Sequence, residues 1–286
     1  FGKHDVGVLA LWEFYNDRTD WVKAYRQFTV GAIDQIGAGD KTNINNDGKA
    51  SVSAHTGLVG RINYAFASKY LAEFSFRYDG SYKFAPGKRW GFFPAGSLGW
   101  RISEEPFLKK YYWLSSLKLR ASWGLTGNND IANYSFMNKL SSANYSFGSG
   151  TGKVSSGLAN PTSVIANRDI TWEQSSEYNY GLDLSLFDNR INFSGEYYYS
   201  ETVQMLYQQT ALSITGFQKF WNNIGKVANK GFEFELRTMN IDKEKFSWKS
   251  SFNISFNKNE LLDLAGEVRQ INYGERQESY LAEVGK

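Results

Sequence analysis

The amino-acid sequence predicts an all-β chain that forms part of an antiparallel transmembrane β-barrel, and three observations lead to that prediction. Alternate residues are apolar over segments of about 10–15 residues, which suits a tilted membrane crossing and exceeds the usual strand of a soluble sheet. Aromatic residues make up 17% of the chain and gather near the ends of these segments, as interfacial girdles require. Short and long connections alternate along the chain. A soluble β-sandwich also shows one apolar and one polar face, so a soluble carbohydrate-binding or adhesive module is the alternative.

The clearest alternation covers residues 246–257. Successive side chains of a strand point to opposite faces, so two sets of residues separate there. One face would carry Phe246, Trp248, Phe252, Ile254 and Phe256, and the other Ser247, Lys249, Ser251, Asn253 and Ser255. The same two-residue period covers 70–78, 117–125, 178–186 and 191–199. This pattern indicates a long-stranded, meandering β chain.

In chain order the sequence predicts nine strands, at 4–14, 55–65, 69–79, 89–103, 116–126, 172–186, 190–204, 225–240 and 246–259. The tight connections are Phe66–Ser68 and Asp188–Asn189, with 241–245 nearly as short and 104–115 of medium length with one helical turn. The long connections are 15–54, 80–88, 127–171, 205–224 and the segment from 260 onward. Short turns of an outer-membrane barrel face the periplasm and long loops face outside. Pro94 lacks an amide donor and should occupy a bulge or an unpaired position.

The strand count is odd, whereas complete bacterial barrels have an even number of strands. We therefore expect residues 1–286 to be part of one barrel domain, truncated at both ends and without a plug domain. The chain starts without Met and closes without a terminal apolar strand, which favours the same interpretation.

Charged residues at the polar positions of the strands are expected to line the lumen, because a Lys or Arg on the lipid side would cost about 2–4 kcal/mol at the bilayer midplane. They are Arg61, Glu73, Arg77, Arg101, Lys118, Arg120, Asp183, Glu196, Glu233, Glu235, Arg237 and Lys249. Arg77 and Glu73 are expected to form an ion pair, and Asp79-Gly80 to begin a turn. For most of these residues we expect a solvated, salt-paired wall.

Aromatic residues of two long loops are the candidates for contact with a substrate, because sugars are bound by aromatic faces with amide partners. Loop 127–171 carries Tyr134, Phe136, Tyr145 and Phe147, and loop 205–224 carries Phe217, Phe220 and Trp221. The same side chains could instead pack the loops against one another or against a partner protein, so both roles stay open.

Other classes of function find little support in the composition. The mean hydropathy is −0.47, and no apolar run of about 18 residues exists that could form a transmembrane helix. The net charge is +3 with both signs interspersed, so a nucleic-acid partner is not expected. There is no cysteine, and the two histidines stand apart. We predict no catalytic residue, no cofactor and no metal site, and hence no enzyme.

The block from Gly60 to Asn128 carries an ordered run of motifs. It contains Gly-Arg-Ile-Asn-Tyr at 60–64, Arg-Tyr-Asp-Gly-Ser at 77–81, Arg-Trp-Gly-Phe-Phe-Pro at 89–94, Gly-Trp-Arg-Ile-Ser at 99–103 and Leu-Lys-Leu-Arg-Ala-Ser-Trp-Gly at 117–124. Thr-Trp-Glu at 171–173 and Asn-Lys-Gly-Phe-Glu at 229–233 follow later. This run resembles the barrel of the SusC/RagA family of TonB-dependent outer-membrane transporters of Bacteroidetes-type bacteria. Loops 15–54 and 129–168 match it least.

The resemblance implies a 22-stranded barrel with an N-terminal plug, opened by TonB with ExbB/ExbD and located in the cell outer membrane. It implies as partners a SusD-like surface lipoprotein, which lids the barrel, and the outer-membrane lipid. The nutrient it implies is a glycan or oligosaccharide, or in some members a peptide. A passive porin is a further alternative, which a plug encoded upstream would exclude.

Overall fold

The computed structural model describes residues 2–27, 35–40, 44–147, 153–159, 164–264, 270–273 and 280–285. Its main element is a nine-stranded antiparallel sheet in the order β1-β2-β3-β4-β5-β9-β10-β13-β14. The strands are β1 (His4–Arg26), β2 (Ile44–Phe66), β3 (Tyr70–Ser81), β4 (Trp90–Arg101), β5 (Leu114–Asn128), β9 (Glu173–Leu186), β10 (Ile191–Val203), β13 (Lys226–Lys243) and β14 (Phe246–Asp263). Each strand pairs with the next one of this series, so the sheet is a continuous meander that confirms the predicted all-β class.

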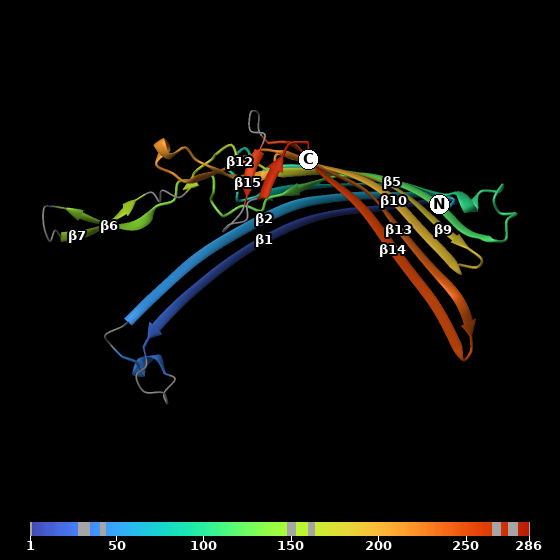
Figure 1. Ribbon diagram of the computed structural model, residues 1–286, viewed down its shortest axis with the longest axis horizontal. Coiled ribbons are helices and arrows are strands. Elements are labelled where there is room, and N and C mark those ends of the chain that lie inside the picture. Colours follow the sequence, from blue (N-terminus) through green and yellow to red (C-terminus); the bar gives the residue numbers. More distant parts are fainter. Residues whose placement is uncertain are drawn as a thin grey trace.

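Figure 1 shows the sheet as a single curved layer, with the β1–β2 and β13–β14 hairpins descending at the two ends of an arch. No second sheet covers either face of these nine strands over the described ranges. A β-sandwich would bury its apolar face between two sheets. The structure therefore contradicts the soluble sandwich and agrees with an open segment of a barrel wall.

The tight turns lie at one end of the sheet and the long connections at the other. Ala67 and Ser68 have φ of 53° and 55°, and Lys69 N–H donates to the Phe66 carbonyl oxygen at 2.9 Å. Asp188 and Asn189 likewise have φ of 54° and 61°. Two central residues with positive φ characterise the type I′ turn, whose twist matches that of the flanking strands. The predicted tight turns are thus confirmed, and we name this end of the sheet the short-turn end and the other the long-loop end.

Several boundaries differ from the prediction, most of all in the first two strands. β1 and β2 each continue for 23 residues, so the expected loop 15–54 shrinks to the segment between Arg26 and Ile44. Beyond Tyr15 the hairpin carries mixed polar and apolar side chains on both faces, and its strands are held by pairing from Arg26 with Ile44 onward. Amphipathic alternation therefore could not indicate them. Similarly, β3 continues through the expected turn at Asp79-Gly80, and β13 runs to Lys243.

The strand register sorts the side chains into two faces. One row across the sheet contains Asn63, Glu73, Ser97, Ser122 and Asn179, which oppose one another from β2 to β9. The adjacent row contains, among others, Tyr64, Ala72, Leu98, Ala121 and Tyr180. Because this alternation continues through the sheet, we name the two sides the polar face and the apolar face.

The apolar face is open, and its aromatic residues form two bands. Val8, Leu98 and Phe252 are 74%, 66% and 60% exposed. Tyr70 stacks on Trp100 at the short-turn end, and Tyr78 stacks on Trp90 eight residues further along. Eight residues span about 27 Å of strand, and a tilt of about 40° leaves about 20 Å of depth. The two bands therefore lie about 20 Å apart in depth, somewhat less than the apolar belt of about 25 Å between the aromatic girdles of such barrels.

Pro94 occupies the kind of position that its missing amide donor predicts. It faces Phe76 of β3, while the pairing of β4 with β5 begins one residue later, at Ala95 opposite Gly124. No helix of the described residues is long and apolar enough to cross a membrane.

Smaller elements build the long-loop end. They are β6 (Ser141–Phe147), β7 (Lys153–Ala159), β8 (Val164–Ile165), β11 (Leu206–Thr210), β12 (Lys219–Asn223), β15 (Gln270–Tyr273), β16 (Tyr280–Glu283) and the 3-10 helices η1 (Ile36–Ala38) and η3 (Ser213–Thr215). A third 3-10 helix, η2 (Ile102–Glu104), follows β4 at the short-turn end. β6 pairs with β7, and β12 lies between β11 and β8. The two longest loops are thus partly strands.

Candidate functional site

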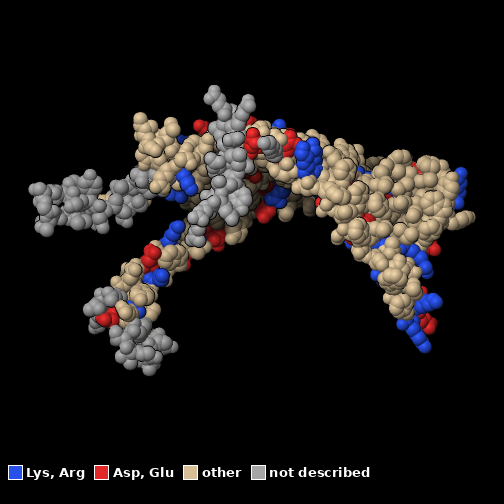
Figure 2. Space-filling view, in the orientation of Figure 1, with Lys and Arg blue, Asp and Glu red and all other residues tan. Residues whose placement is uncertain are grey.

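The polar face of the sheet is the candidate functional surface. All the charged strand residues expected in the lumen fall on it by register, and charged side chains follow the inner side of the arch in Figure 2. Charged strand residues also occur on the apolar face, but those such as Lys230 and Lys258 lie toward the long-loop end of their strands. The face can therefore act as a wetted wall that hydrogen-bonds a polar solute or a polar protein surface.

Arg120 of β5 joins three strands in one ion-pair network. Its guanidinium lies 2.8 Å from the Glu196 carboxylate of β10 and 3.2 Å from the Asp183 carboxylate of β9. Ser194 donates its hydroxyl hydrogen to Asp183 at 2.9 Å, and Asn179 hydrogen-bonds Glu196. Glu196 and Glu233 stand directly opposite each other in the register, which is unfavourable for like charges. Arg120 offsets this repulsion.

Arg77 forms a second network, and it differs from the expected one. Both guanidinium contacts to Asp79 are 3.0 Å, and Glu13 of β1 lies 3.5 Å away. Asp79 is 7% exposed and also lies 3.6 Å from His55. The predicted pair of Arg77 with Glu73 does not form, because residues 77 and 79 are adjacent on the same face of one strand while Glu73 lies two such positions away.

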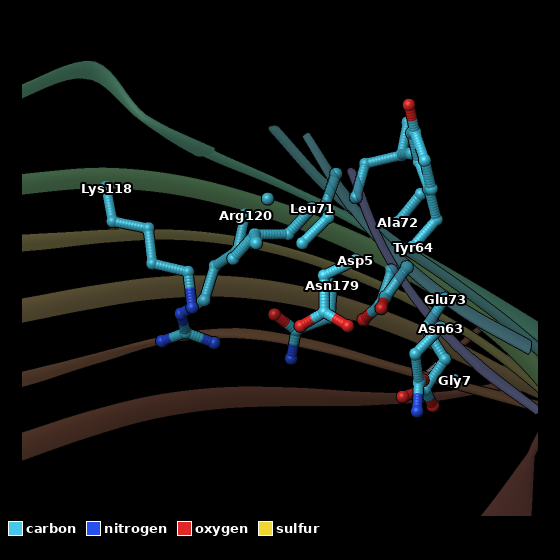
Figure 3. Close-up of a pocket in the computed structure, with 16 residues that line it drawn as sticks. Asp5, Gly7, Asn63, Tyr64, Leu71, Ala72, Glu73, Lys118, Arg120 and Asn179 are labelled. Atoms are coloured by element: carbon cyan, nitrogen blue, oxygen red, sulfur yellow. The ribbon is translucent and has the colours of Figure 1, made fainter. Parts of the chain in front are cut away.

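A hollow of about 490 Å³ lies in the polar face between the two networks. Figure 3 shows Lys118, Arg120, Asn179, Asp5 and Glu73 among its lining, with their polar ends on the same side of the ribbon. Within the described residues Glu73 and Lys118 form no ion pair closer than 4 Å.

The Asn63 side chain adds an unsatisfied acceptor to this hollow. Its Oδ1 atom is buried and has no hydrogen-bond partner among the described residues. A buried acceptor without a partner costs about 1–3 kcal/mol, so a donor from a solute, water or another protein segment would stabilise it. The hollow thus offers a carboxylate and an ammonium group to a polar ligand, and the Asn63 amide lies in its wall. Sequence reasoning named Glu73 and Lys118 and missed Asn63, which alternation marks only as another polar position.

The loop aromatics fall into different environments. Phe136 is 8% exposed and belongs to a buried cluster, which we name the loop core and which comprises Phe84, Ala85, Phe93, Ile131, Phe136, Ile170 and Trp172. Trp221 of β12 packs against it. Tyr134 is 40% exposed and Phe217 and Phe220 are half-buried, so these three can reach a ligand. The side chains of Tyr145 and Phe147 lie outside the described residues.

Hydrogen bonds between the loops fix the loop core. Asn223 exchanges two bonds with the backbone of Thr171, at 2.7 and 2.9 Å, and Trp172 donates its indole N–H to the Arg89 carbonyl oxygen at 3.0 Å. Lys83 reaches the Asn129 carbonyl oxygen at 3.2 Å. The connections after β3, β5 and β10 therefore form one platform above the polar face, and Phe136 is a structural part of it.

At the opposite end, Glu105 anchors the turn between β4 and β5. Its carboxylate accepts hydrogen bonds from the Tyr70 hydroxyl at 2.7 Å, from Lys69 at 3.1 Å and from the Trp100 indole at 3.2 Å. These donors hold the pKa of Glu105 below its ordinary value, with the Tyr70 bond as the largest cause. The sequence predicted only a connection of medium length at 104–115, so this structural role of Glu105 was missed.

Comparisons with known proteins agree with this architecture. Residues 3–277 match the family model described as TonB dependent receptor-like, beta-barrel. The TonB-dependent receptor P39 of Formosa agariphila is 42% identical over 79% of this chain and 21% of its own length. The TonB-dependent receptor SusC of Bacteroides thetaiotaomicron is 36% identical over 72% of this chain and 21% of its own length.

Among solved structures, the RagAB peptide transporter superposes with a TM-score of 0.88 at 26% identity, covering 100% of this chain and 31% of that one. The chain thus spans between a fifth and a third of the proteins it matches here. The family match over nearly the whole chain, the polar face and the open apolar face lead to one conclusion: the chain belongs to the TonB-dependent receptor β-barrel family of outer-membrane proteins, and within it resembles SusC and RagA.

Proposed function

We propose that this chain is the barrel wall of a TonB-dependent importer that takes up an oligosaccharide across the outer membrane. The observation that carries the proposal is the polar hollow at Asn63, Glu73 and Lys118, in a sheet of this family. The Glu73 carboxylate, the Lys118 ammonium group and the Asn63 amide all line it, and among the described residues neither charged group has an ion-pair partner, which suits a hydroxyl-rich solute. The exposed ring of Tyr134 and the half-buried ring of Phe217 at the long-loop end would capture the sugar before it enters.

A peptide is the second candidate substrate. The likeness to the RagAB peptide transporter supports it, and the pairing of a free carboxylate with a free ammonium group in the hollow suits a zwitterionic ligand. The two candidates differ in their dependence on charge. Neutral sugars would need the amide and the aromatic rings, whereas a peptide would need Glu73 and Lys118.

Two partners belong to the proposal. A SusD-like lipoprotein would cover the long-loop end, where the loop core presents a rigid platform. TonB with ExbB/ExbD would drive opening through a plug in the parent protein. Both are supported by the likeness to SusC and RagAB.

Deleting the parent gene in its source bacterium tests the proposal. Growth on one class of oligosaccharide should be lost and restored by the wild-type gene, and a tagged parent protein should copurify with a lipoprotein. Restoration by Glu73→Gln with Lys118→Gln, but not by Asn63→Ala with Tyr134→Ala, would indicate a sugar, and the reverse a peptide. Unchanged growth on all oligosaccharides and peptides would refute the importer.

A further inference from the structure

A second hollow, of about 1040 Å³, lies on the apolar face. Its wall consists of rings and aliphatic side chains of six adjacent strands, from β3 to β13, among them Tyr70, Trp100, Tyr180, Tyr197, Phe232 and Phe234. Gly195 and Ala121 lie between these rings and supply almost no side chain. A depression of this size among large rings leaves a contiguous apolar surface, and such a surface marks a site for a membrane or another apolar partner.

The register places this hollow near the short-turn end. Gly195 is the fifth residue of β10 and faces Leu182 of β9, four residues before that strand ends. Tyr70 and Trp100 are the first and the second-to-last residues of their strands, again at this end. Short turns of outer-membrane barrels face the periplasm. The hollow therefore lies at the depth of the periplasmic leaflet.

The turn between β4 and β5 attaches a basic, aromatic segment to the rim of the hollow. Glu105 joins the turn to two of the rings that line the hollow, through the hydrogen bonds from Tyr70 and Trp100. One helical turn follows, with Lys109 N–H donating to the Glu105 carbonyl oxygen at 3.2 Å. Lys109 and Lys110 are exposed, and Lys110 lies 5.1 Å from the Tyr111 ring centroid.

The charge around this rim favours an anion. Three lysines stand beside two carboxylates: Lys69 pairs with Glu105 at 3.1 Å and Lys109 with Glu104 at 3.5 Å. Lys110 has no carboxylate within 4 Å among the described residues, so the rim keeps an excess of positive charge. In Figure 2 the rightmost part of the molecule is largely uncharged with basic side chains at its tip, whereas the descending β13–β14 hairpin carries charges of both signs. Tyr112 and Trp113 are 94% and 50% exposed, as expected of rings at the headgroup level.

We propose that the hollow is a specific binding site for one phospholipid of the periplasmic leaflet. An acyl chain fills the space over Gly195 and Ala121, and the lipid phosphate lies against Lys109 and Lys110. The apolar face continues on both sides of the hollow as the membrane surface, so a lipid reaches it by lateral diffusion. The rings supply an apolar subsite and the basic turn supplies a subsite for an anion. A second protein copy would not need this combination.

Lipid retention by the full-length parent protein tests this site. The protein would be extracted in mild detergent, supplied with dioleoylphosphatidylglycerol and weighed intact by native mass spectrometry. Gly195→Leu should lower retention at least about tenfold, since displacing two buried methylene groups has that effect. A Cβ at Gly195 already meets Phe193 at 3.2 Å, so leucine would occupy the hollow. Replacing Lys109 and Lys110 by Gln should lower retention about fivefold per lysine.

Gly96→Leu is the matched control, because Gly96 lies on the apolar face outside this hollow and its nearest neighbour would be 3.7 Å from the new Cβ. It should retain lipid as the wild type does. Equal retention by all variants would overturn the proposal, and so would a shift from dimer to monomer in Gly195→Leu without lipid loss, which would assign the hollow to a second copy.

A measurement on the unmodified protein guards against variants that fail to fold. Phosphatidylglycerol with a photoactivatable acyl chain, incorporated in nanodiscs around the wild-type parent protein, should cross-link mainly to the β10 segment around Gly195 and to β5 around Ala121. Cross-links spread evenly over the apolar face would mean ordinary solvating lipid and would refute a specific site.

Discussion

Replacing Trp172 by Ala should open the loop core while leaving the barrel wall intact. Trp172 is 5% exposed, and its ring centroid lies 5.4 Å from that of Phe84 and 5.3 Å from that of Phe93. A buried ring of this size covers about 150–250 Å², and at about 25 cal/mol per Å² its loss costs roughly 4–6 kcal/mol as an upper bound. Measured Trp→Ala substitutions in cores cost about 3–5 kcal/mol. We therefore expect about 4 kcal/mol.

Hydrogen exchange of the refolded parent protein measures this loss locally. The amides of Lys88, Met137 and Asn167 are held by hydrogen bonds within and between the loops, and they should exchange at least about a hundredfold faster in Trp172→Ala. Amides of the β9–β10 pairing should not change. Ile214→Ala is the control, because Ile214 is 94% exposed. Unchanged exchange at the loop amides, or an equal increase in the strands, would refute a loop core that is stabilised separately.

Three further predictions concern the wall. Arg120→Ala should lower the free energy of unfolding in detergent by about 1–2 kcal/mol, because carboxylates of two neighbouring strands lose their shared partner while the site stays partly solvated. A double-mutant cycle with Asp183→Asn should show coupling between the two residues, and additive effects would contradict the network. Gly231→Ala should impair refolding, because a Cβ there would overlap the Phe256 carbonyl oxygen and the Tyr198 hydroxyl, whereas Gly96→Ala should refold normally. Glu105→Gln tests a pH effect: the pKa of Glu105 is lowered in the folded state, so its contribution is complete above the unfolded pKa of about 4.3 and is lost as pH falls through the folded value. Thermal stability below pH 4 should therefore fall less in Glu105→Gln than in the wild type.

The faces of most of the sheet could be predicted from the sequence because the strand period is two and every strand, apart from the outer part of the β1–β2 hairpin, is amphipathic in the same sense. Once β10 pairs with β9 so that Ser194 faces Asp183, the face of the sheet on which each remaining residue of both strands lies is fixed. The type I′ turns at Ala67-Ser68 and Asp188-Asn189 set that register. Local rules therefore determine the wall.

The loop core and the particular ion pairs could not be predicted in this way. Phe136 and Tyr134 are two residues apart in a loop of similar composition, yet one ring is buried and the other is 40% exposed. That difference depends on the distant Phe84 and Trp172, which meet only when the connections after β3 and β5 come together. Likewise, Arg77 selects Asp79 and Glu13 over Glu73 because of side-chain reach, which alternation does not encode.

The two faces together restrict where the chain can be stable. On the polar face Glu196 and Glu233 oppose each other, and one arginine serves two carboxylates, so the charges need water or a polar partner against them. On the apolar face Trp12 is 71% exposed and Leu98 66%, so these side chains need hydrocarbon. Two such sheets packed apolar face to apolar face would also satisfy both requirements, but no second sheet covers this one over the described ranges. A single layer with lipid on one side and a wet lumen on the other satisfies both requirements. On the lipid side, the hollow over Gly195 is the place where the sheet would bind one lipid rather than only contact the membrane.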